Sequence, residues 1–185
     1  MARALELVVA LMIFPAIFII MLLCAIAIAV FDRGPIFFTS ERLGKNKQIF
    51  TMVKFRTMST CAPLVPSSHT DASIYVTCFG RFLRFTSLDE LPQILNILNG
   101  SMTFIGPRPC LVSEHQLIQL RKNKDVFSMT PGVTGLAQVR GRDRNSDRNK
   151  VRYESFYMEK KSFLFDLNIM MMTIKAVLKF SNISH

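Results

Sequence analysis

Paired metal and redox ligands are absent from this 185-residue chain. Its four cysteines are scattered without a Cys-x-x-Cys motif, and its three histidines have no partners at metal-ligand spacing. The sequence therefore argues against a zinc site, a redox dithiol and a disulfide scaffold, and reduced thiols suit a cytosolic body. No Gly-Lys-Ser/Thr follows its glycines, which excludes a P-loop.

Charge is also scarce, and it is unevenly placed. Only 19% of the residues are charged and half are hydrophobic, which excludes a disordered or fibrous chain. Residues 1–33 carry no net charge, so the net +10 lies on residues 34–185. A neutral apolar head and a basic body indicate membrane attachment and an anionic partner. Phospholipid, nucleic acid and phosphorylated metabolites all fit this composition.

One long hydrophobic run predicts insertion into a membrane. Leu7 to Phe31 are 25 consecutive uncharged residues, and as a helix they would reach ~38 Å, more than the ~30 Å hydrocarbon core. The run is too long for a signal-peptide core. Pro15 leaves two geometries open, a spanning helix or a kinked, re-entrant one. In both, the basic residues that follow place the body on the cytoplasmic side.

The body reads as α+β and mostly helical. Ile36–Thr39 and Ile49–Arg56 predict a strand hairpin, residues 60–77 a loop, and Leu136–Val139 a short strand. The predicted helices are Ser87–Asn99, with capping-box spacing between Ser87 and Glu90, then Ser113–Asn123, and a helical stretch from about Val151 to Phe180.

The last helical stretch carries an apolar face. Leu167, Met171, Ile174 and Leu178 share this face, which fits either core packing or the membrane interface.

Asp89-Glu90 is the chain's adjacent acidic pair, at the start of the best-marked helix. Helix capping is one interpretation, because acidic residues are favoured there. In the other, one carboxylate attacks a phosphorus or binds Mg²⁺ while the second assists. Arg81 and Arg84 precede the pair closely and suit phosphate oxygens.

Three further segments suit an anionic ligand. Arg108 lies between two prolines, which would fix its guanidinium for bidentate phosphate recognition; a solvated turn is the alternative. Lys54 and Arg56 cluster at a strand end. Pro131 to Arg142, which includes Gln138, has the glycines needed for close backbone approach to a ligand.

Six motifs together resemble one family, and they occur in family order. They are Gly34-Pro35-Ile36-Phe37-Phe38, Lys54-Phe55-Arg56-Thr57-Met58, Gly80-Arg81-Phe82-Leu83-Arg84, Ser87-Leu88-Asp89-Glu90-Leu91-Pro92-Gln93, Gly106-Pro107-Arg108-Pro109 and Pro131 to Val139. The chain resembles the bacterial sugar transferases, monotopic phosphoglycosyl transferases, over roughly residues 14–180.

The resemblance implies a reaction. A sugar-1-phosphate would pass from a UDP-sugar to undecaprenyl phosphate, with release of UMP, at the start of glycan assembly. By resemblance, Asp89 is the nucleophile that forms an aspartyl phospho-sugar in a ping-pong cycle, and Glu90 helps to place Mg²⁺. Lys54, Arg84, Arg108 and Gln138 are the expected substrate-binding residues, and their cations suit a phosphoryl group. The resemblance leaves the sugar and the glycan pathway open.

The resemblance also implies an architecture and a location. Residues 1–33 would form a re-entrant membrane helix, and residues 34–185 a catalytic domain with amphipathic helices at the interface. The expected location is the cytoplasmic face of the bacterial inner membrane, with its lipids as partners and no nucleic acid. Two alternatives stay open: a catalytically degenerate relative, and a basic membrane-anchored binding protein without catalysis.

Overall fold

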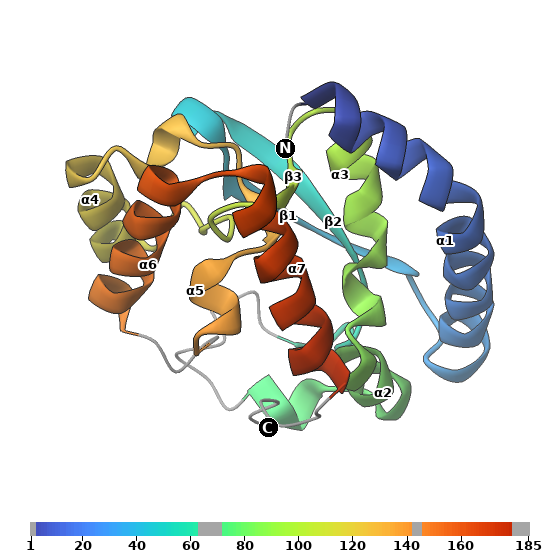
Figure 1. Ribbon diagram of the computed structural model, residues 1–185. Coiled ribbons are helices and arrows are strands. Elements are labelled where there is room, and N and C mark those ends of the chain that lie inside the picture. Colours follow the sequence, from blue (N-terminus) through green and yellow to red (C-terminus); the bar gives the residue numbers. More distant parts are fainter. Residues whose placement is uncertain (1–2, 63–71, 142–145, 179–185) are drawn as a thin grey trace.

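The computed structural model describes residues 3–62, 72–141 and 146–178 (Figure 1). Its class is α+β and mostly helical, as predicted. The helices are α1 (Arg3–Phe31), α2 (Cys78–Thr86), α3 (Ile94–Leu98), α4 (His115–Asn123), α5 (Leu136–Val139), α6 (Asp147–Lys160) and α7 (Phe163–Leu178). The strands are β1 (Phe37–Leu43), β2 (Ile49–Phe55), β3 (Thr103–Ile105) and β4 (Gly132–Thr134). Short 3-10 turns are η1 (Lys45–Lys47), η2 (Ala72–Tyr75), η3 (Leu88–Gln93) and η4 (Val126–Ser128).

The predicted hairpin is confirmed. β1 and β2 pair antiparallel along their whole length, from Phe37 opposite Phe55 to Leu43 opposite Ile49. β1 is longer than the sequence pattern indicated, so the turn is confined to Gly44–Gln48, where the Gly44 amide donates to the Gln48 carbonyl. A short turn of this kind fixes the register, and with it the residues at the two strand ends.

α1 is long, apolar and largely exposed. Among the described helices, α1 alone is long and apolar enough to cross a membrane, and one such helix is weak support for membrane association. Pro15 lies inside it, and the ribbon bends part-way along its length (Figure 1), as expected where a proline removes a backbone hydrogen bond. Only one side, including Ala10 and Ile28, is buried against the body. Leu11, Met12 and Leu23 are each more than 60% exposed.

Two apolar cores support the fold. One joins α1, β2, α2, η3 and α3, and its fully buried members include Ile28, Phe55 and Leu83. The other lies among β3, α4, α5, α6 and α7. Phe104 of β3 packs against both clusters. β3 therefore lies between the two cores and packs against both.

The predicted helix at Ser87–Asn99 is wrong in its first half. Ser87 is left-handed, with φ of 59°, and ends α2; its side chain makes no capping hydrogen bond. Leu88–Gln93 then forms the 3-10 turn η3, and α3 covers only Ile94–Leu98. Pro92 explains the change, because it lacks an amide proton and disfavours α geometry in the residue before it.

The glycine-rich stretch also differs from its prediction. The strand is Gly132–Thr134, parallel to β3, and Leu136–Val139 is the short helix α5. A side chain on Gly135 would come within 2.1 Å of the Gly106 carbonyl oxygen. The backbones touch there, so the strand ends and the chain turns into α5.

The C-terminal helical stretch is two helices. α6 ends at Lys160, and Ser162 begins α7 by accepting a hydrogen bond from the Phe165 amide at 3.2 Å. Leu167, Met171 and Ile174 are 46–48% exposed, so the apolar face they share does not pack in the core. The side chain of Leu178, residues 179–180 of the predicted stretch and residues 63–71 of the predicted loop lie outside the described residues.

Candidate active site

Four consecutive residues at the end of strand β2 and just after it have different partners. Lys54 points toward the acidic pair, and its Nζ contacts Glu90 Oε1 at 2.5 Å. Phe55 is buried in the core. Arg56 is buried too, and its guanidinium binds the carbonyls of residues just after α1, including Pro35 at 2.6 Å. Thr57 receives α2. Lys54 therefore faces the acidic pair, whereas Arg56 and Thr57, which follow the end of β2, bind the segment after α1 and the next helix.

α2 is docked on Thr57 by close backbone contact. A side chain on Gly80 would come within 2.1 Å of the Thr57 carbonyl oxygen, so this position admits glycine alone. Thr77 caps the helix by accepting from the Gly80 amide at 2.9 Å. One turn later, Arg84 Nε donates to Thr57 Oγ1 at 2.8 Å. Burial lowers the pKa of Arg84, while the negative charge of Asp89 raises it.

Glu90 is held by two cations from separate parts of the chain. Lys54 contacts Glu90 Oε1 at 2.5 Å and Arg108 Nη1 contacts the same oxygen at 3.5 Å. The Glu90 side chain is 22% exposed, so this cluster lies at the edge of solvent. Such charge-assisted contacts are strong when partly desolvated, and they fix the carboxylate beside Asp89.

Asp89 differs from its neighbour. Within the described parts of the chain, its carboxylate accepts no hydrogen bond. Burial first, and then the negative charge of Glu90, raise its pKa to about 6; Lys54, Arg84 and Arg108 counter the rise. The carboxylate is thus unoccupied and poorly solvated, with three cations nearby. A strongly perturbed pKa in such a cluster is typical of functional sites.

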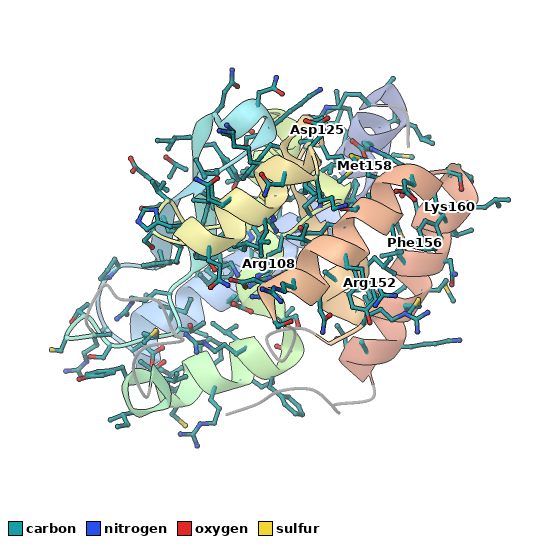
Figure 2. All side chains as sticks on the ribbon, turned by 90° about the vertical axis from the view of Figure 1, so that its left-hand side faces the viewer. Arg108, Asp125, Arg152, Phe156, Met158 and Lys160 are labelled. Carbon is teal, nitrogen blue, oxygen red and sulfur yellow. The ribbon has the colours of Figure 1, made fainter. Side chains whose placement is uncertain are left out.

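The loop that carries Arg108 is built to be rigid. The Gly106 amide donates to the Thr134 carbonyl and the Gly132 amide donates to the Pro107 carbonyl, each at 2.9 Å. Figure 2 shows Arg108 on the face of the molecule that also presents Arg152 of α6. The Arg108 side chain is 47% exposed, while its backbone is fixed.

A buried ion pair holds the Arg108 backbone from behind. Arg121 of α4 donates to the Arg108 carbonyl at 2.8 Å and to both carboxylate oxygens of Glu154 in α6. The two side chains of this pair are 3% and 2% exposed. Sequence reasoning missed this role, because Arg121 at the basic end of a helix looks like an ordinary C-terminal cation.

Gln138 is not brought into the Asp89 cluster. Its Nε2 donates to the Val133 carbonyl at 2.9 Å, and its buried Oε1 has no hydrogen-bond partner among the described residues. Val133 lines a small cleft with Gly132, Lys54 and Arg108. Gln138 therefore touches the site only through the backbone of its own loop.

The donor set fits a hard divalent cation that is bound mainly through substrate. The described residues hold no group of three acidic, histidine or cysteine side chains suited to a metal. The adjacent carboxylates of Asp89 and Glu90 repel each other, and a cation near them would relieve that repulsion. Mg²⁺ is often bound by one or two carboxylates plus substrate phosphates and waters. Glu90 and Asp89 are the residues that would hold it here.

The motifs that contact one another match a known family. The sequence model described as bacterial sugar transferase matches residues 1–180. The chain belongs to the bacterial sugar transferase family. The resemblance seen in six sequence motifs is therefore confirmed. In the structure, the motifs of Lys54, Arg84 and Arg108 meet the Asp89-Glu90 motif of this sugar transferase.

Relatives of this sugar transferase include short and long proteins. It is 35% identical over 164 residues to the uncharacterized sugar transferase EpsL of Bacillus subtilis (strain 168), covering 86% of this chain and 78% of EpsL. It is 35% identical over 169 residues to the UDP-glucose:undecaprenyl-phosphate glucose-1-phosphate transferase of Klebsiella pneumoniae, covering 84% of this chain. It is 33% identical over 165 residues to the undecaprenyl-phosphate galactose phosphotransferase of Salmonella typhimurium, covering 80% of this chain. The chain spans only 35% and 34% of these last two proteins.

Proposed function

We propose that this phosphoglycosyl transferase moves a sugar-1-phosphate from a UDP-sugar to undecaprenyl phosphate and releases UMP. Membership in the family and the names of two relatives support the reaction class. The single observation that carries the mechanism is the contrast between the two carboxylates. Glu90 is engaged by Lys54 and Arg108, whereas Asp89 accepts no hydrogen bond from the described residues.

That contrast supports Asp89 as the nucleophile. One Asp89 oxygen attacks the sugar-bearing phosphorus, a P–O bond forms, and the bond to the other phosphate breaks with its electron pair leaving on UMP. An oxygen of the acceptor phosphate then attacks the aspartyl phosphate, which frees the Asp89 carboxylate and forms the polyprenyl diphosphate sugar. Lys54, Arg84 and Arg108 stabilise negative charge on the transferring group. A bound Mg²⁺ would add charge neutralisation beside Glu90.

We also propose that α1 enters the membrane and returns to the same side. Both ends of this helix are fastened to one body. At its start, Arg3 donates to the carbonyls of Ile97 and Met102, and Glu6 accepts from the Thr103 hydroxyl. Just after its end, Asp32 accepts from the Thr77 hydroxyl at 2.7 Å. A helix that spans a bilayer has its ends on opposite faces, which these contacts oppose.

The exposed apolar surface fits this topology. The outer side of α1 and the Leu167, Met171 and Ile174 face of α7 would meet lipid, with the catalytic body on the cytoplasmic side. The topology is tested with Leu5→Cys and Arg33→Cys, each in a background whose native cysteines are replaced. Both should react with a membrane-impermeant maleimide from the same side of sealed vesicles, and labelling from opposite sides would refute re-entry.

The reaction is tested without the lipid acceptor first. A donor labelled at the sugar-bearing phosphorus should label the purified protein covalently in Mg²⁺ buffer, and unlabelled UMP should remove the label by reversing the step. Asp89→Asn should abolish the label, and a control Glu41→Gln, an exposed acid of β1, should keep it. Covalent label that persists in Asp89→Asn would reject Asp89 as the nucleophile.

The acceptor half-reaction is tested next. Undecaprenyl phosphate added to labelled protein should transfer the label to the lipid. Repeating the assay with a panel of UDP-sugars identifies the donor. If folded wild-type protein binds UDP-sugar yet never releases UMP with any donor, the chain is a binding relative without catalysis and the proposed reaction is wrong.

A further inference from the structure

A small cleft shares two cations, Lys54 and Arg108, with the Asp89-Glu90 cluster. Its lining includes Arg42 of β1, Lys54 of β2, Gln93 at the end of η3, Arg108, Gly132 and Val133. Lys54 and Arg108 contribute to both places, because they also contact Glu90. The cleft is therefore continuous with the candidate active site through shared side chains.

Arg42 is the cation of this cleft that the proposed reaction does not use. Its pKa is lowered by burial and next by the positive charge of Arg108, and Glu114 counters this only in part. The Glu114 carboxylate is itself engaged by the Leu111 amide at 2.6 Å. Arg42 Nε donates to Ser40 Oγ at 3.2 Å, within its own strand. Two arginines thus line one cleft, and Glu114, the acid whose charge acts on Arg42, accepts a hydrogen bond from a backbone amide.

The fold holds this arrangement in place. The amide of Leu43, the residue after Arg42, donates to the Cys110 carbonyl at 3.0 Å, which ties β1 to the loop that carries Arg108. Arg121 fixes the same loop at the Arg108 carbonyl. The fold therefore keeps Arg42 desolvated and close enough to Arg108 to be repelled by it, and an anion in the cleft would relieve both costs.

We propose that Arg42, with Lys54 and Arg108, forms a subsite for a second phosphate beside the one at Asp89. The proposal rests on the proposed function. The ligand chemistry is a phosphate ester, which is either the uridine-linked phosphate of the donor or the phosphate of the lipid acceptor. An arginine fork suits both, because guanidinium binds two phosphate oxygens at once.

The first arm measures binding without turnover. UDP serves as the probe, titrated by calorimetry into the full detergent-solubilised chain with Mg²⁺. If the subsite takes the donor's second phosphate, Arg42→Gln should weaken UDP binding about tenfold or more. Arg42→Lys should weaken it by a smaller factor, because lysine keeps the charge and loses the fork. Lys45→Gln is the matched control: it removes one exposed cation from the same hairpin and should leave the affinity unchanged.

The second arm uses the acceptor. If the subsite takes the lipid phosphate, UDP affinity stays at the wild-type value while the KM for undecaprenyl phosphate rises about tenfold in Arg42→Gln. Thermal unfolding of each variant checks the fold, and Arg42→Lys decides the outcome if Arg42→Gln unfolds. Unchanged UDP affinity together with an unchanged acceptor KM would overturn the subsite. Absence of turnover in wild-type protein that binds UDP would instead count against the proposed reaction.

Discussion

At the scale of single residues, Asp89 is held in a state that costs the fold stability. Its folded pKa of about 6 lies above the ordinary aspartate value of 3.8, so folding favours the protonated form. Below about pH 4 the residue is protonated in both states and nothing is lost. Between about pH 4 and pH 6 the unfolded chain releases this proton while the folded protein keeps it, so stability falls across that range and levels off above it. This is the cost of keeping a poorly solvated carboxylate at this position.

Asp89→Asn should therefore raise the melting temperature in a pH-dependent way. With EDTA present to exclude divalent cations, we expect no difference from wild type near pH 4, a gap that grows up to pH 6, and a rise of a few degrees above it. Scanning fluorimetry over this pH range measures the gap, and Glu41→Gln should show none. If the Asp89→Asn protein melts at the wild-type temperature at pH 8, the ionised Asp89 carboxylate does not destabilise the fold and this interpretation is wrong.

The same scale shows what the sequence could reveal. Asp89, Glu90, Lys54, Arg84 and Arg108 were identified from short motifs, and the structure brings them together because each motif carries its own side chain to the site. Thr57 and Arg121 were not recognised as organising residues. Their partners lie 27 and 33 positions away, and no local pattern encodes contacts over such separations.

At the scale of elements, the buried pair between α4 and α6 locks the loop of Arg108. Glu154→Gln leaves the guanidinium of Arg121 buried without its counter-charge, and breaking such a pair costs about 3–5 kcal/mol. Denaturant unfolding should show a loss of this size. Asp147→Asn removes a partly exposed partner of Lys150 on the same helix, and should cost less than about 1 kcal/mol. Equal effects of the two substitutions would refute the role of the buried pair.

Elements were predicted well where periodicity was strong. The hairpin and α4 follow from alternation and from an apolar face. The short elements near the site were not predicted correctly. The structure has the 3-10 turn η3 where the sequence predicted the start of a helix, because of Pro92. It has the helix α5 where the sequence predicted a strand, because Gly135 lies against the Gly106 carbonyl. Tertiary contacts decide the geometry of segments this short.

At the scale of the whole molecule, Arg56 connects the end of α1 to the body that carries the Asp89-Glu90 pair. Arg56 is 7% exposed, and its guanidinium donates to the carbonyls of Asp32, Arg33 and Pro35. Arg56→Gln should loosen this junction, so that limited trypsin digestion in detergent cuts after Arg33 several-fold faster than in wild type. Arg81→Gln, an exposed cation of α2, is the control and should digest like wild type. An unaltered digestion rate at Arg33 in Arg56→Gln would show that the junction does not depend on this residue.

The fastening of α1 also sets an order of events during synthesis. Arg3 and Glu6 find their partners only at Ile97, Met102 and Thr103, so almost a hundred further residues must be translated before the start of the helix can be secured. At typical rates of elongation this takes about 5–20 seconds. Throughout that interval the hydrophobic run is free of the body that will hold it. A ribosome stalled before Thr103 is translated therefore leaves a nascent chain whose first helix has not yet acquired its final topology.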